Sequence, residues 1–126
     1  MRWVGRSGSG EPVTELAASA LSIGIEAAVA PALTAALVPP AERRHRAFVA
    51  AGVAAAGTLI THPAVWYGAL ALYPRIGVAP TLAVVETGAV LVEAALYCIV
   101  LPPSRALVVS LGANAASALL GAWLTW

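Results

Sequence analysis

Four long apolar stretches make up almost the whole chain, and they constrain its fold more than any other feature. They cover residues 13–38, 47–72, 79–101 and 104–126 of the 126-residue sequence. Each could form a helix that crosses the hydrocarbon core of a bilayer, which takes about 20 residues. Since 60% of the residues are hydrophobic and only 10% are charged, a soluble domain of this length could not bury its apolar surface. The sequence therefore predicts an all-α integral membrane protein.

Three short breaks separate these stretches, at residues 39–46, 73–77 and 102–105. Each break contains proline and arginine. Short connections place consecutive helices antiparallel to each other. We therefore expect four transmembrane helices in an up-down-up-down bundle over residues 13–126. A Gly- and Ser-rich segment at residues 1–12 is typical of a flexible tail.

The two halves of the sequence resemble each other. Glu26 and Glu93 both stand before two alanines, and each stretch then ends at a Pro-Pro pair followed by arginine. One interpretation is a duplicated helical hairpin, whose copies would be related by an axis along the membrane normal. The other is chance, because alanine-rich membrane helices that end in proline resemble one another.

Polar side chains inside the apolar stretches follow helical spacing. In the first stretch they lie at positions i, i+4, i+7 and i+11, and the fourth stretch repeats these offsets: Glu15, Ser19, Ser22 and Glu26, then Ser110, Asn114, Ser117 and Gly121. Such residues share one face of a helix. Because a carboxylate that faces lipid is costly, these faces are expected to turn into the bundle.

Three glutamates, Glu26, Glu86 and Glu93, lie at membrane depth with no arginine or lysine beside them. His62 is the one basic side chain at that depth, and Asn114 is a further candidate hydrogen-bond partner. Burial and mutual repulsion both disfavour an ionised carboxylate. We therefore expect at least one of the three glutamates to be protonated at neutral pH, and we expect that glutamate to be Glu93 or Glu26. Intramembrane acids of this kind predict a proton or cation site, whereas the alternative is that they only join helices.

Small residues on the same helices predict close packing. Ala113, Ser117 and Gly121 are spaced by four, and Gly52 lies in the second stretch. Small residues at this spacing let helices approach closely. Since four short helices enclose little volume, we expect the chain to form homo-oligomers or to join a larger membrane complex.

The sequence argues against several other functions. It contains no motif of a hydrolase, nucleotide-binding protein or metalloenzyme, so an enzyme is disfavoured and no cofactor or metal is expected. A single cysteine, Cys98, excludes an internal disulfide, and a net charge of +1 gives no reason to expect nucleic acid. The favoured function is a subunit of a membrane complex or a small proton- or cation-coupled transporter. The alternative is a structural accessory protein.

The expected location is the inner membrane of a bacterium. An alanine-rich chain without lysine or aspartate is typical of a GC-rich bacterial genome. Orientation is nearly balanced, because Arg2, Arg6 and Arg75 lie on one side and four arginines lie on the other: Arg43, Arg44, Arg46 and Arg105. The larger group slightly favours termini that face away from the cytoplasm.

Overall fold

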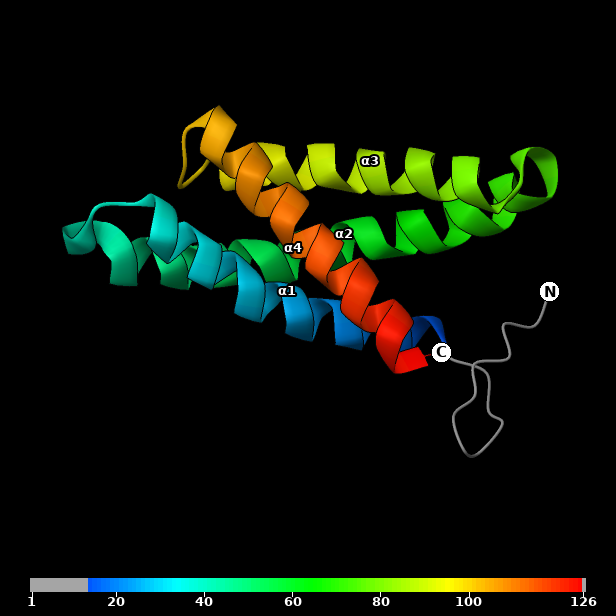
Figure 1. The fold of residues 1–126 in the computed structure, drawn as a ribbon, viewed down its shortest axis with the longest axis horizontal. Coiled ribbons are helices and arrows are strands. Elements are labelled where there is room, and N and C mark those ends of the chain that lie inside the picture. Colours follow the sequence, from blue (N-terminus) through cyan, green and yellow to red (C-terminus); the bar gives the residue numbers. More distant parts are fainter. Residues whose placement is uncertain (1–13, 126) are drawn as a thin grey trace.

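The computed structural model describes residues 14–125, which are all-helical: four α-helices and one 3₁₀ turn (Figure 1). The predicted tail at residues 1–12 lies outside the described residues. The elements are α1 (Glu15–Leu37), η1 (Pro40–Glu42), α2 (Arg43–Ile76), α3 (Val78–Tyr97) and α4 (Pro103–Thr125).

The helices begin and end where local chemistry requires. Thr14 caps α1, because its hydroxyl accepts a hydrogen bond from the backbone N–H of Ala17 at 3.2 Å. α2 ends at Gly77, whose φ of +83° is a left-handed conformation that glycine adopts without strain. The N–H of Gly77 closes the last turn on the carbonyl of Tyr73 at 3.0 Å.

Three of the observed boundaries differ from those expected: both ends of α2 and the end of α3. α2 runs from residue 43 to residue 76 rather than from 47 to 72, so the break expected at residues 73–77 shrinks to Gly77 alone. Pro74 removes only one backbone hydrogen bond, and the Gly77 N–H still closes the helix beyond it. α3 ends at Tyr97 rather than at residue 101, because the chain tightens there into i→i−3 turns, with Ile99 N–H on the carbonyl of Leu96 at 3.1 Å and Val100 N–H on that of Tyr97 at 3.0 Å.

Three elements are long and apolar enough to cross a membrane: α1, the continuous segment Pro40–Ile76, and α3. Many of their large apolar side chains are exposed on the outside of the molecule, among them Leu16, Phe48, Leu59, Ile60 and Leu91. This pattern is consistent with lipid as the surrounding medium. The fourth expected span, which corresponds to α4, is not among the three.

The helices pack in a closed ring, in which α1 and α3 each contact both α2 and α4. In Figure 1, α1, α2 and α3 lie along the long axis, and α4 crosses them obliquely. We call the end that holds the α1–α2 and α3–α4 connections the arginine end. The opposite end, which holds the start of α1 and the end of α4, is the terminal end. The apolar core lies towards the arginine end and consists mainly of small side chains: Ala30, Val38, Ala50, Ala54, Tyr97, Leu101, Ala106, Val109 and Ala113.

Candidate functional site: a buried carboxyl cluster

Six polar side chains from all four helices are buried together in the middle of the molecule. We call them the carboxyl cluster: Glu26 on α1, Thr58 and Thr61 on α2, Glu93 on α3, and Asn114 and Ser117 on α4. Glu26 is 3% exposed and Glu93 is 1% exposed. The polar stripes predicted from the sequence are buried at five of their positions: Ser19, Glu26, Ser110, Asn114 and Ser117.

Glu93 is held by two helices. Its Oε1 atom lies 2.7 Å from the hydroxyl oxygen of Thr61 on α2, and its Oε2 atom accepts a hydrogen bond from the amide of Asn114 on α4. The Asn114 amide also donates to the carbonyl of Ser110, one turn earlier, at 3.0 Å. Both carboxyl oxygens of Glu93 are therefore occupied, and the side chain has one fixed orientation.

Glu26, on α1, makes a similar contact with the neighbouring threonine of α2. Its Oε2 atom lies 2.7 Å from the hydroxyl oxygen of Thr58, and Ser117 on α4 lies beside it. Each glutamate thus lies between a threonine of α2 and a polar side chain of α4. Thr58 and Thr61 are three residues apart, as are Asn114 and Ser117, so both pairs lie on one helix face.

The hydroxyl groups of Thr58 and Thr61 each lie near two possible hydrogen-bond acceptors. Thr58 Oγ1 lies 2.9 Å from the carbonyl oxygen of Ala54, and Thr61 Oγ1 lies 3.0 Å from that of Gly57. Each hydroxyl therefore has two acceptors within reach, a backbone carbonyl and a glutamate oxygen. Because a hydroxyl carries a single proton, it cannot donate to both.

Gly57 lets Glu93 come close to α2, and the sequence reasoning missed it. A Cβ atom at this position would lie 3.1 Å from Cγ of Glu93 and 3.6 Å from its Cδ. Gly112 has a similar role between α4 and α1, where a Cβ would lie 2.7 Å from Leu33 Cδ1. In the sequence, Gly57 stands one residue before Thr58, in a helix that carries polar residues. This position hinted at a close contact, but it does not show which helix approaches the glycine.

The small residues chosen from the sequence divide into two groups. Ala113 and Ser117 are buried between helices, as close packing requires. A Cβ atom at Gly52 or Gly121, in contrast, would meet nothing within 4 Å. The packing role of Gly52 and Gly121 therefore stays a prediction.

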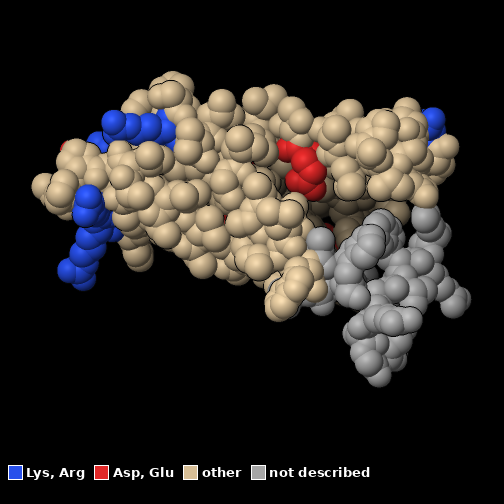
Figure 2. All heavy atoms as spheres, viewed as in Figure 1, with Lys and Arg blue, Asp and Glu red and all other residues tan. Residues whose placement is uncertain are grey.

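Glu86 lies outside the hydrogen-bonded cluster but acts on it electrostatically. It is half-buried on α3, two turns before Glu93, and it interacts with the charges of both Glu93 and Glu26. Figure 2 shows acidic atoms at the surface near the middle of the long axis, away from the arginines at the two ends. Glu86 is thus the member of the three glutamates that is in partial contact with the surroundings.

His62 is not brought to the glutamates as a hydrogen-bond partner. Its Nε2 atom is buried and has no hydrogen-bond partner among residues 14–125, and its ring stacks on Trp66 with centroids 6.4 Å apart. Its electrostatic partner is Glu15, near the start of α1. Tyr97 is fully buried one turn after Glu93, and its hydroxyl likewise lacks a partner within the described part of the chain.

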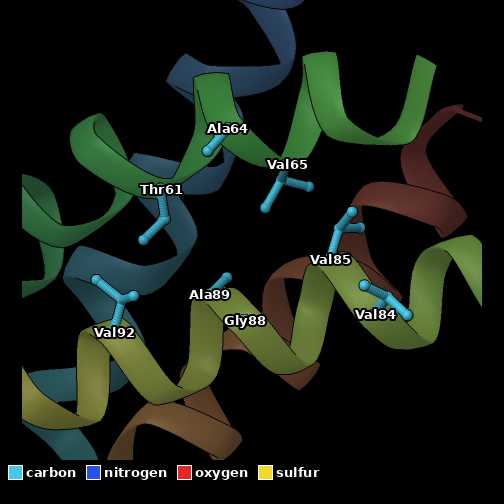
Figure 3. Close-up of a pocket in the computed structure, with 8 residues that line it drawn as sticks. All are labelled: Thr61, Ala64, Val65, Val84, Val85, Gly88, Ala89 and Val92. Atoms are coloured by element: carbon cyan, nitrogen blue, oxygen red, sulfur yellow. The ribbon is translucent and has the colours of Figure 1, made fainter. Parts of the chain in front are cut away.

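A cavity of about 270 Å³ lies between α2 and α3, beside the cluster (Figure 3). Apart from Thr61, its walls are apolar side chains and glycine: Ala64, Val65, Val84, Val85, Gly88, Ala89 and Val92. Figure 3 shows the Thr61 side chain directed into the space between the two helices. The hydroxyl that contacts Glu93 is therefore also one wall of this cavity.

In the part of the chain that the structure describes, no cationic side chain forms an ion pair with the buried carboxyls. Within residues 14–125, the ion pair that the structure shows joins Arg46 to Glu42 at the arginine end, and no group of His, Cys, Asp and Glu side chains there could hold a metal ion. The cluster must therefore be stabilised by hydrogen bonds or by loss of charge.

Comparison with known proteins finds no matching family model, no similar curated protein and no similar solved structure. The chemistry of the carboxyl cluster is therefore the basis on which a function is argued.

Proposed function

We propose that the chain is a four-span integral membrane protein that exchanges protons through Glu26, Glu86 and Glu93, as a small transporter or as a subunit of a membrane complex. The observation that carries this proposal is the pair of buried glutamates that have no cationic partner among residues 14–125, each held between a threonine of α2 and a polar side chain of α4. Intramembrane carboxyls of this kind commonly mark proton or ion pathways.

The hydrogen bonds fit neutral glutamic acids. If Thr61 donates its single proton to the carbonyl of Gly57, its oxygen is left to accept a proton from Glu93 Oε1. The other oxygen, Oε2, then accepts from Asn114. Every polar group in this chain of contacts is satisfied when Glu93 carries a proton, and Thr58 with Ala54 offers the same arrangement to Glu26.

The burial of Glu26 and Glu93, and their nearness to each other, also favour the protonated, neutral form of the two side chains. A carboxylate in a medium of low dielectric constant loses its hydration, and two carboxylates close together repel each other. Glu26 and Glu93 are almost fully buried and interact electrostatically with each other. Ionisation of one therefore disfavours ionisation of the other, which suits a site that holds a single proton.

The proposed access route leads from the terminal half. Glu86 is half-buried and interacts with both inner glutamates, so it can relay protons between them and the surroundings. Towards the arginine end the interior is closed by fully buried apolar side chains such as Ala50, Ala106 and Val109. The arrangement resembles a pathway that is open on one side and closed on the other in this conformation.

A purely structural role is the second candidate, and the closed hydrogen-bond network favours it. A protonated glutamate that donates to one helix and accepts from another joins three helices without exchanging protons. Interhelical hydrogen bonds in membranes contribute about 0.6 kcal/mol on average, so such joints stabilise the bundle modestly. The two candidates differ in whether the carboxyls change charge during the protein's activity.

Proton flux into proteoliposomes tests this directly, with a pH-sensitive dye inside and an imposed pH gradient. We expect Glu93→Gln to fold with unchanged helix content, because Gln can still hydrogen-bond to Thr61 and Asn114, and to lose the flux. Glu42→Gln is the matched control, since Glu42 lies at the arginine end in an ion pair with Arg46. Flux that persists in Glu93→Gln, Glu26→Gln and Glu86→Gln would contradict the proposal and favour the structural role.

The proposal extends to α4, to assembly and to location. As the fourth span, α4 supplies Asn114 and Ser117 to the cluster, and it exposes large apolar side chains including Leu107, Val108, Leu111 and Leu119. These exposed faces are available to lipid, to a second copy or to a larger complex. We place the protein in a bacterial inner membrane, with both termini on the non-cytoplasmic side.

A further inference from the structure

A second hollow, of about 460 Å³, lies at the arginine end, between the first turn of α2 and the α3–α4 connection. Two of its lining residues, His45 and Arg46, carry polar side chains of α2, and the rest belong to the connection: Cys98, Ile99, Val100, Leu101 and Pro102. Figure 2 shows arginine side chains gathered at this end of the molecule.

Arg46 is held in place but keeps donors to spare. Its Nη1 atom donates a hydrogen bond to the carbonyl oxygen of Val100, and its Nε atom forms an ion pair with the carboxylate of Glu42. A guanidinium has five N–H groups, so several stay available for another ligand. Because the Val100 contact fixes the side chain against the wall of the hollow, little conformational freedom is lost when a ligand binds.

The surrounding charge is positive. Arg43 donates to the carbonyl of Val38, and Arg44 and Arg105 are exposed, with no hydrogen bond or ion pair to a side chain in the described range 14–125. Glu42 is the acidic side chain at this end, and a single carboxylate cannot balance four arginines. The hollow thus combines a fixed guanidinium with an excess of positive charge.

We propose that this hollow binds the phosphate group of an anionic phospholipid, with Arg46 and His45 as its direct donors. The hollow lies at the ends of helices long enough to span a membrane, where lipid phosphates are found. Arginine suits phosphate because its planar fork binds two oxygens at once. Basic pockets at the cytoplasmic ends of transmembrane helices are known to bind anionic head groups.

Binding is measured on the purified full-length chain by native mass spectrometry, with phosphatidylglycerol, phosphatidylcholine and inorganic phosphate as three separate probes. We expect phosphatidylglycerol to bind preferentially. Arg46→Gln should weaken that binding about fivefold or more, the effect expected for one basic side chain near a lipid surface. Arg75→Gln is the matched control, because Arg75 also donates to a backbone carbonyl, that of Ala71, but lies at the terminal end.

A second variant keeps the test valid if Arg46→Gln fails to fold. Glu42→Gln removes the carboxylate that competes for Arg46, so it should bind phosphatidylglycerol at least as strongly as the wild type. Weaker binding in Glu42→Gln, or equal losses in Arg46→Gln and Arg75→Gln, would overturn the proposal. Inorganic phosphate that binds as tightly as phosphatidylglycerol would show a site for a free anion instead. None of these outcomes depends on the glutamates of the carboxyl cluster.

Discussion

The two halves of this bundle solve the same packing problem with opposite chemistry. Towards the arginine end, the helices meet through alanine and valine, and side chains such as Ala50, Ala106 and Val109 are fully buried. In the middle and towards the terminal end, the same helices meet through carboxyl, hydroxyl and amide groups. Close helix approach alone therefore does not require the polar residues. The apolar half does bury the hydroxyls of Thr34 and Tyr97, but within residues 14–125 the buried carboxyl groups lie in the middle of the molecule. This concentration of carboxyls is the strongest reason to assign them a function.

The largest expected effect comes from placing a carboxyl in the apolar half. Val109 is fully buried among small apolar side chains. Val109→Glu would bury a carboxyl that has no prepared partner, which costs several kcal/mol, roughly 3 or more even when it is protonated. We expect loss of the folded state, measured as aggregation on size-exclusion chromatography in detergent. Val109→Leu is the control, because it adds volume without adding a polar group. If Val109→Glu and Val109→Leu behave alike, a carboxyl is no worse tolerated in the apolar half than added volume, which would contradict the comparison.

Filling the space beside Glu93 should have the next largest effect. At Gly57 a Cβ atom already lies 3.1 Å from the Glu93 side chain, so Gly57→Leu must displace the carboxyl from Thr61 and Asn114. We expect a loss of about 2 kcal/mol or more in the free energy of unfolding, in line with other overpacked cores. Gly52→Leu, on the same helix, meets open space and should change stability by less than about 0.5 kcal/mol. Equal effects at both glycines would contradict the close approach of Glu93.

Three Thr→Val substitutions separate threonines that bind a carboxyl from one that does not. Thr61→Val and Thr58→Val remove the partners of Glu93 and Glu26, and each should destabilise the bundle by about 1 kcal/mol. Thr34 is equally buried, but its hydroxyl has no partner among residues 14–125. Thr34→Val should therefore be neutral or stabilising. Denaturation in detergent compares the three, and a costly Thr34→Val would show that its hydroxyl has a partner of its own.

The sequence alone predicted the content of the site better than its geometry. The sequence predicted inward-facing positions for Glu26, Glu93 and Asn114, on the expectation that polar side chains facing lipid would be costly, and all three are buried. Spacing also indicated the helical class and where α1 and α4 begin and end to within two residues. It cannot show which polar residue on one helix meets which on another, since that depends on crossing angle and rotation. Thr58 and Thr61 were therefore not recognised as the two central partners.

His62 and Gly57 are two further residues whose neighbours could not be predicted from helical spacing. His62 was expected to join the glutamates because it was the one basic side chain at their depth, yet its ring stacks on Trp66, one turn away on the same helix. Gly57 was overlooked because the value of a glycine depends on what approaches it, here the side chain of Glu93. Both features depend on three-dimensional neighbours that periodicity does not encode.

The protonation state of Glu93 tests the central claim most directly. Infrared difference spectra of the reconstituted protein at neutral pH should contain the carbonyl band of a protonated carboxyl group, and Glu93→Gln should reduce that band without changing the amide bands of the helices. Its frequency should shift in Thr61→Val, because the hydrogen bond from the acid to the Thr61 hydroxyl is lost. Spectra that show Glu26, Glu86 and Glu93 all ionised at neutral pH, with no cation bound, would contradict the account.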